Sequence, residues 1–279
     1  MQVIDCHHHL WNYSAEQYPW IGPDAGVLKK DFLLPDLQQL SEMNGVDGFV
    51  AVHARQSLED THWLLELAKK STLIRGVVGW VPLRDHEQLS LAIESLSENK
   101  MLKGIRHVIQ DEPDDRFILG DAFNRGIEML GSTEWVYDIL IYAKHLANTI
   151  EFVDRHPEQP FVLDHIAKPT IFADRFDQAW ADHIKQLGKR PNVSCKFSGV
   201  ASEVRDASWN SSTIRPYWDV ALEAFGVKRL MYASDWPVCL LKTDYSRWKE
   251  TVAEFASELT NDEQAAFWSG NASRIYRLD

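Results

Sequence analysis

The chain has 279 residues, 45% of them apolar, and a formal net charge of −12 at pH 7. This length and composition suit a folded protein with a full hydrophobic core. The negative charge argues against nucleic acid as a partner, because proteins that bind nucleic acid present a basic face to the phosphates. No stretch approaches the roughly 18 consecutive apolar residues of a membrane helix, so we expect no membrane partner either. A strand pattern follows Met1 directly, which predicts that no secretory signal peptide is present, and three widely spaced cysteines predict a reduced, cytoplasmic protein.

The first predicted strand covers residues 3–6, an apolar run without helical periodicity, and three histidines follow it. Side chains alternate along a strand, so we expect His7 and His9 on one side and His8 on the other. Two imidazoles at a strand tip can form half of a metal site. The alternative, a remnant of a purification tag, fits less well because a tag has more consecutive histidines and no strand before it.

The same alternation of apolar strands and helices continues along the chain. A helix is expected over residues 35–45, with Leu37, Leu40 and Met43 on one face, and Ser57 is expected to cap the next helix. The further strands are predicted over residues 46–54, 74–81, 104–109, 135–141, 161–166, 192–197 and 229–234. The further helices are predicted up to residue 96, over 122–130, 144–155 and 176–187, from about 215 to 226, and over 246–259 and 262–268.

Eight strands that alternate with helices predict a parallel sheet covered by helices. The count of eight favours an α/β fold with a closed TIM (β/α)₈ barrel, and the absence of any break in composition favours a single domain over residues 1–279. An open, doubly wound sheet is the alternative fold. No G-x-G-x-x-G or phosphate-loop motif opens any unit, which weakens the nucleotide-binding form of that alternative.

Catalytic groups of such a barrel lie at the carboxyl ends of its strands. The polar and aromatic residues at the predicted strand ends are His7, His9, His53, Gln56, Trp80, Arg106, His107, Tyr142, His165, Lys168, Lys196, Ser198, Asp235 and Trp236. Asp235 is the strongest single candidate after the first two histidines, because a carboxylate in a buried strand is costly unless it is paired or binds a metal. Simpler explanations remain for Arg106 as an ion-pair residue and for His107 as a histidine bonded to the backbone.

Five segments taken together resemble the amidohydrolase superfamily, and within it the TIM-barrel, metal-dependent hydrolase branch that contains sugar lactonases. These segments are H-x-H at residues 7–9, Gly-Ile-Arg-His at 104–107, D-H-x-x-K-P at 164–169, K-x-S-G at 196–199 and S-D-W-P at 234–237. The resemblance runs from the first strand to the last. It implies a distorted (β/α)₈ barrel that opens an aldonolactone such as L-fucono- or L-rhamnonolactone.

The resemblance also implies a metal site, with two departures from the superfamily pattern. In the superfamily a Lys or Glu on the fourth strand bridges a second metal, but here that strand ends in Arg106 and His107. The fifth strand ends at Tyr142, where a histidine ligand would be expected. We therefore expect at most one divalent metal, most simply zinc, and a metal-independent site stays open. The implied ligands are His7, His9, His165 and Asp235.

The expected mechanism is attack of water on the lactone carbonyl, with Asp235 as general base. The carbonyl would be polarised by the metal or, without a metal, by hydrogen bonds from His7, His9, Arg106 and His107. The predicted catalytic residues are thus Asp235, His107 and Arg106. The predicted substrate-binding residues are Trp11, Gln56, Trp80, Lys196 and Trp236.

Two other functions remain open. One is a metal-dependent decarboxylase or amide hydrolase that acts on an acidic substrate, because Arg55, Arg106, Lys168 and Lys196 are cations at strand ends. The other is a non-catalytic barrel that binds a sugar or a metal. In each case the partner is a small molecule, and the pattern makes no prediction of oligomeric state.

Overall fold

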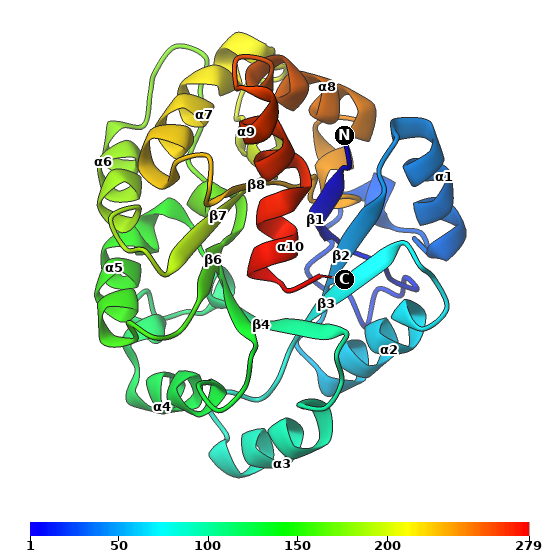
Figure 1. Cartoon of the computed structure of the whole chain (residues 1–279), viewed down its shortest axis with the longest axis vertical. Coiled ribbons are helices and arrows are strands. Elements are labelled where there is room, and N and C mark those ends of the chain that lie inside the picture. Colours follow the sequence, from blue (N-terminus) through cyan, green and yellow to red (C-terminus); the bar gives the residue numbers. More distant parts are fainter. Residues whose placement is uncertain (279) are drawn as a thin grey trace.

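Eight parallel strands follow one another around the sheet in their order along the chain, as seen in the computed structural model, which describes residues 1–278 (Figure 1). The strands are β1 (Ile4–His8), β2 (Gly48–Val52), β3 (Ile74–Gly79), β4 (Leu102–Val108), β5 (Val136–Leu140), β6 (Phe161–Leu163), β7 (Val193–Phe197) and β8 (Leu230–Tyr232). A single parallel bridge between His8 and Trp236 joins the last strand region to the first. This sequential order confirms the predicted barrel and excludes the doubly wound sheet.

Helices surround the barrel, and the last of them crosses one of its openings. They are α1 (Leu34–Asn44), α2 (Leu58–Ala68), α3 (His86–Leu96), α4 (Asp121–Leu130), α5 (Leu146–Arg155), α6 (Gln178–Leu187), α7 (Ser211–Phe225), α8 (Tyr245–Ala256), α9 (Asn261–Ala265) and α10 (Asn271–Ile275). Ser57 caps α2 as predicted, because its side chain accepts a hydrogen bond from the backbone of Asp60. The expected start of α7 near residue 215 was wrong, since Asn210 caps this helix and its first residue is Ser211, four residues earlier than expected.

The apolar face of α1 differs from the prediction. Leu37 and Ser41 are its buried positions, one helical turn apart, whereas Met43 is 71% exposed. Met43 lies two residues after Ser41, which places its side chain on the opposite side of the helix. The end of the helix at Gly45 was predicted correctly, and Gly45 has a φ of +61° there.

The barrel has its own interior core, distinct from the layer between sheet and helices. This core consists of Ile4, Cys6, Val50, Val52, Val78, Val136, Val162, Met231, Ala233, Ala272 and Tyr276. The last two come from α10 and the residue that follows it, and α10 crosses the barrel opening in Figure 1. The Lys103 ammonium near the start of β4 donates to the carbonyl of Arg277 at 2.7 Å, so the carboxyl-terminal segment closes the amino-terminal end of the barrel.

Strand β1 has an irregular register that matters for the site. Its pairing with β2 shifts between Asp5 and His8. Ile4 and Cys6 belong to the interior core, and the rings of His7 and His9 nevertheless contact each other, so Cys6 and the adjacent His7 both point inward. A bulge of this kind lets two consecutive residues face the same side. His8 faces the other way, against Phe49 at a ring distance of 5.1 Å.

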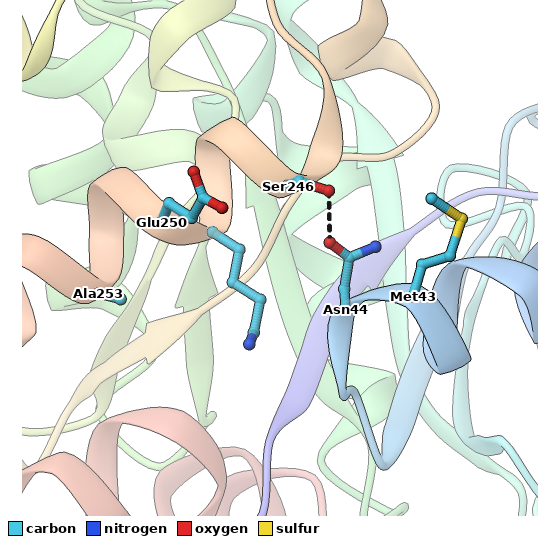
Figure 2. Close-up of a pocket in the computed structure, with 6 residues that line it drawn as sticks. Met43, Asn44, Ser246, Glu250 and Ala253 are labelled. Carbon is cyan, nitrogen blue, oxygen red and sulfur yellow. Dashed lines mark hydrogen bonds between the residues drawn. The ribbon is translucent and has the colours of Figure 1, made fainter.

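A surface pocket of about 210 Å³ lies between α1 and α8. Figure 2 shows its lining residues Met43, Asn44, Ser246, Glu250 and Ala253, with the Ser246 hydroxyl donating to Asn44 at 2.7 Å. None of the predicted site residues lines this pocket, so it is separate from the strand-end cluster. Among the residues described, no helix combines the length and the apolar character needed to cross a membrane.

Candidate active site

Four side chains meet at the carboxyl ends of β1, β6 and β8. The Nε2 atoms of His7 and His9 lie 3.2 Å apart. The Asp235 Oδ1 atom lies 3.3 Å from Nε2 of His9, 3.7 Å from Nε2 of His7 and 3.7 Å from Nε2 of His165. All four residues are buried. The structure therefore brings together the four residues that the sequence had proposed as metal ligands.

The hydrogen bonds of the imidazoles show which nitrogen atoms face the cluster with a lone pair. Nδ1 of His9 lies 2.8 Å from the carbonyl oxygen of Val52, and because a carbonyl only accepts, the proton of neutral His9 is on Nδ1. Its Nε2 atom is then a bare acceptor. Nδ1 of His165 lies 2.8 Å from the Ser198 hydroxyl, which leaves its Nε2 atom pointing toward Asp235.

His7 is held from two sides. The Asp164 carboxylate lies 3.3 Å from Nδ1, and the Arg106 guanidinium lies 3.3 Å from Nε2. A carboxylate only accepts and a guanidinium only donates, which favours a proton on Nδ1 and a lone pair on Nε2. The Lys196 ammonium is also 3.2 Å from Nδ1, but it has two carboxylates to which it donates.

Burial keeps the rings of His7 and His165 neutral. It lowers the pKa of His7 well below the ordinary value for histidine, and it lowers the pKa of His165 to about 4. Burial would raise the pKa of Asp235, but His165 and His9 outweigh that effect and hold the pKa below its usual value. At neutral pH His7 and His165 are thus neutral and Asp235 is ionised, the protonation states that a metal requires of its ligands.

The spacing of these atoms fits one tetrahedral ion. Ligand atoms at 2.0–2.1 Å from a zinc ion are separated by roughly 3.3 Å in tetrahedral geometry, and the distances among Nε2 of His7, Nε2 of His9 and Oδ1 of Asp235 are 3.2, 3.3 and 3.7 Å. The Arg106 guanidinium lies 3.3 Å from Nε2 of His7, whereas Nε2 of His9 and the Asp235 carboxylate face each other at 3.3 Å, an arrangement that a cation between them would stabilise. His7, His9 and Asp235 therefore fit a divalent metal, and His165, whose Nε2 atom lies 3.7 Å from Asp235, is the neighbouring candidate for a fourth ligand.

The backbone around two of these residues is left-handed. Residues 165–168 have consecutive φ values of +53°, +47°, +62° and +48°, and Asp235 has a φ of +61°. Each such residue costs about 1–2 kcal/mol when it is not glycine. Strain of this kind persists only where the surrounding structure enforces it, and it is concentrated at functional sites. Here the residues with left-handed backbone include His165 and Asp235 themselves.

Comparison with known proteins points to one family. The family model described as "Amidohydrolase" matches residues 4–278. The chain is 40% identical to a protein of Burkholderia multivorans named L-fucono-1,5-lactonase, over 99% of this chain and 96% of that protein.

The chain belongs to the amidohydrolase family.

Two further relatives extend this result. A crystal structure of an amidohydrolase from Burkholderia multivorans with bound zinc superposes on this amidohydrolase with a TM-score of 0.94, at 38% identity and full coverage of both chains. A protein of Scheffersomyces stipitis named L-rhamnono-gamma-lactonase is 24% identical, over 75% of this chain and 70% of that protein. The resemblance to the superfamily that contains sugar lactonases is thereby confirmed.

Not every predicted residue of this amidohydrolase reaches the cluster. Lys196 was expected to bind substrate, but it is fully buried and lies beneath His7, where it pairs with Asp138 at 2.5 Å and Asp164 at 3.0 Å. The Lys196 side chain points into the barrel core and not toward the opening. The expected substrate contact of Lys196 was therefore wrong.

His107 is also placed elsewhere. It follows Arg106 on β4, so its side chain points to the opposite face of the strand. Its ring stacks on Phe117 at 5.0 Å, and its Nε2 atom donates to Glu112 at 2.7 Å. The structure gives His107 a structural environment between the sheet and the helices, which does not support the catalytic role expected for it.

The aromatic residues expected to contact the substrate divide by exposure. Trp11 is fully buried and Trp236 is 5% exposed, because both pack against Phe32. Trp11 has no face open to a ligand, which corrects the expectation for it, whereas Trp236 is as exposed as the neighbouring Asp235 and its substrate contact stays a prediction. Trp80 is half-buried. Trp20, which sequence reasoning missed, is 43% exposed, and its indole N–H donates to the carbonyl of Ala54 just beyond β2.

Arg106 lies beside the site, whereas the contact that places Gln56 is with the end of β4. The Arg106 guanidinium donates to Asp164 at 3.2 Å and to the carbonyl of His53 at 2.6 Å, so much of its hydrogen-bonding capacity is used within the protein. The Gln56 carbonyl oxygen accepts from the backbone of Val108 at 2.8 Å. Its amide nitrogen is left for another acceptor.

Two carboxylates that sequence reasoning did not assign are central to the structure. Asp164 contacts His7, Arg106 and Lys196, and Asp138 pairs with Lys196. Asp138 stands inside the apolar strand segment 135–141. A carboxylate within a buried strand was the signal that singled out Asp235, and the same signal applied to Asp138.

Proposed function

We propose that this amidohydrolase opens a sugar-acid lactone by attack of water on the lactone carbonyl. The observation that carries the proposal is the 40% identity to L-fucono-1,5-lactonase over 99% of the chain. The more distant relative named L-rhamnono-gamma-lactonase supports the same substrate class. L-Fuconolactone is accordingly the first substrate to test, and L-rhamnonolactone the second.

The chemistry assigns a general base to the site. Asp235 is ionised and buried beside His9 and His165, so its carboxylate can take a proton from the attacking water. The hydroxyl of the water adds to the carbonyl carbon, and Asp235 then passes the proton to the ring oxygen that leaves. Arg106 adds positive charge close to His7, where it can stabilise the negative oxygen of the intermediate.

A single zinc ion on His7, His9, His165 and Asp235 is the proposed cofactor, and when bound it would polarise the lactone carbonyl as a Lewis acid. The zinc-bound relative supports this choice of metal. In the alternative without metal, hydrogen bonds to the carbonyl oxygen would come from His7, His9, Arg106 and His107. Nδ1 of His9 faces the Val52 carbonyl and His107 is bonded to Glu112 away from the cluster, so Arg106 beside His7 is the main donor left for that version.

The surroundings of the site fit a neutral substrate better than an acidic one. The cations expected to hold a substrate carboxylate are largely paired within the protein. Arg55 pairs with Asp60 at 3.2 Å, and Lys196 is buried between two carboxylates. This supports a lactonase over a decarboxylase of an acidic substrate.

The three cysteines are free and buried, which supports the proposed cytoplasmic location.

A panel of aldonolactones with a pH indicator tests the proposed function. We expect acid release with L-fuconolactone at a kcat/KM at least 10² times the value for unrelated aryl esters. Carbon dioxide release from aromatic carboxylates is the matched measurement for the decarboxylase alternative. Turnover of carboxylates without turnover of any lactone would contradict the proposal.

Removal of metal should abolish most of the activity. We expect that prolonged dialysis against a chelator lowers kcat by at least about 10²-fold, because the carbonyl loses its Lewis acid, and that stoichiometric zinc restores it. Elemental analysis before and after dialysis should give one zinc per chain and then none. Undiminished turnover in a sample shown to be free of metal would exclude the proposed cofactor.

Gly199 offers a test of the site geometry. Its φ is +64°, and a Cβ atom there would lie 3.0 Å from Nδ1 of His165 and 3.2 Å from Oδ2 of Asp235. We expect Gly199→Ala to lower kcat by roughly 10²-fold, since small displacements of catalytic groups have effects of this size. Gly45→Ala is the matched control, because Gly45 has a φ of +61° with no atom within 4 Å of its added Cβ.

Both alanine variants should lose about 1–2 kcal/mol of stability from the left-handed backbone, measured by urea denaturation. Only the change at Gly199 should reduce turnover in the lactone assay. Equal kcat values for Gly199→Ala and the unmodified enzyme would show that His165 and Asp235 tolerate displacement, which contradicts their assigned roles.

A further inference from the structure

A chain of buried polar contacts connects the carboxyl-terminal segment to the active-site cluster. The Tyr276 hydroxyl lies 2.8 and 2.9 Å from the two carboxylate oxygens of Asp138 and donates to this group. Asp138 binds Lys196 at 2.5 Å, and Lys196 lies 3.0 Å from Asp164. Asp164 in turn lies 3.3 Å from Nδ1 of His7. All five side chains are completely buried or nearly so.

Each link in this chain limits the next. The Lys196 ammonium lies between two carboxylates and has one position that satisfies both. If Asp138 rotated, Lys196 would follow it and draw Asp164 away from His7. The Tyr276 hydroxyl contacts both oxygens of Asp138, including Oδ2, to which Lys196 donates, and the Tyr276 ring centre lies 5.4 Å from the ammonium. The orientation of the His7 imidazole thus depends on a residue at the closed end of the barrel.

We propose that Tyr276 is a positioning residue of the active site, which acts on His7 through Asp138, Lys196 and Asp164. The proposal rests on the proposed lactonase function for its kinetic test, but not for its binding test. It assigns two tasks to the carboxyl-terminal segment. The segment closes the amino-terminal opening of the barrel, and Tyr276 orients the His7 imidazole at the opposite, catalytic opening.

The electrostatics of Asp138 support this role. Burial raises the pKa of Asp138 to about 6, and the hydrogen bonds from Lys196 and Tyr276 oppose that rise. The groups that face Asp138 are Lys196 from β7, Asp164 after β6, Cys6 from β1 and Tyr276. Without the tyrosine hydroxyl the carboxylate loses a donor, so its pKa rises further. Asp138 would then be protonated at a higher pH than in the unmodified enzyme.

The test is Tyr276→Phe, which removes the hydroxyl and keeps the ring in the interior core. We expect kcat to fall by roughly tenfold, as for other groups that orient a metal-binding histidine, with KM for the lactone unchanged within twofold. The acidic limb of the kcat profile should move to higher pH. Zinc affinity, measured by competition with a chromophoric chelator, should fall by a similar factor.

Tyr217→Phe is the matched control, because Tyr217 is equally buried but lies in α7, where its ring packs against Trp180 and Phe176. It should change neither zinc affinity nor the acidic limb, even if it alters the melting temperature. A purely structural role for Tyr276 would give the opposite result, with lower thermal stability but the same kcat, pH profile and zinc affinity as the unmodified enzyme. That outcome would overturn the proposal.

Failure of the proposed function can be told apart from failure of this inference. If the unmodified chain hydrolyses no lactone, the lactonase proposal falls, and zinc affinity alone decides the role of Tyr276. If the unmodified chain turns over lactone and Tyr276→Phe matches it in kcat, pH profile and zinc affinity, only the positioning role falls.

Discussion

Replacing Asp235 with asparagine is expected to lower kcat for lactone hydrolysis by about 10³-fold, within the range for loss of a general base. Asparagine has nearly the same shape, but its amide cannot take a proton from water. It also removes the negative charge that lies 3.3 Å from His9 and 3.7 Å from His165. The fold should survive, because the substituted side chain still fills the same space beside the two rings.

Asp85→Asn is the matched control for that experiment. Asp85 caps α3 by accepting a hydrogen bond from Gln88, and asparagine caps helices about as well as aspartate. The two variants should have similar melting temperatures, and only Asp235→Asn should lose turnover in the lactone assay. Full turnover by Asp235→Asn would remove the assignment of Asp235 as the base.

The largest expected effect on stability comes from Lys196→Met. Methionine fills a similar volume but leaves the carboxylates of Asp138 and Asp164 buried without their shared ammonium. Removing one partner of a buried ion pair typically costs 3–5 kcal/mol, so we expect a loss of about 4 kcal/mol in the free energy of unfolding near pH 7.5. Urea denaturation followed by circular dichroism measures this difference.

The loss should depend on pH in a defined direction. Lys196 lowers the pKa of Asp138, which burial otherwise raises and which stands at about 6 with the lysine present. Without Lys196 this pKa is higher still, so at pH 5 the Asp138 carboxyl is protonated and no longer a buried charge. The difference between variant and unmodified enzyme should therefore shrink between pH 7.5 and pH 5.

Lys69→Met provides the control for removal of an ion pair as such. Lys69 pairs with Glu66 at 2.5 Å, but both side chains are well over half exposed, and exposed pairs contribute roughly 0–1 kcal/mol. If Lys196→Met were as stable as Lys69→Met at pH 7.5, the buried network would not stabilise the fold.

The barrel could be predicted from the sequence because its strands are short apolar runs and its helices carry local start signals. Ser57 shows this, since the cap could be identified from the residue type and its position before a helical pattern. Asp235 could be predicted as a site residue because a buried carboxylate needs a partner. These are local properties, and they do not require knowledge of what lies across the barrel.

The parts that the sequence did not reveal depend on contacts between distant segments. Lys196 follows a strand pattern typical of a strand end, yet its ammonium is placed by Asp138, 58 positions away in sequence. The bulge in β1 arises from pairing with β2 and has no sequence signal of its own. Tyr276 follows the last helix and enters the barrel interior only because α10 crosses the opening.

The contact between the last strand region and the first, where His8 pairs with Trp236, should affect local dynamics. Only the His8–Trp236 bridge pairs the two strand regions directly, whereas β4 and β5 are paired at five positions. Amide hydrogen exchange should therefore be faster at this contact than within the β4–β5 ladder. An ion bound by His7 and His9 from the β1 region and by Asp235 after β8 would link the two strand regions. Protection of their amides from exchange should therefore rise with metal occupancy.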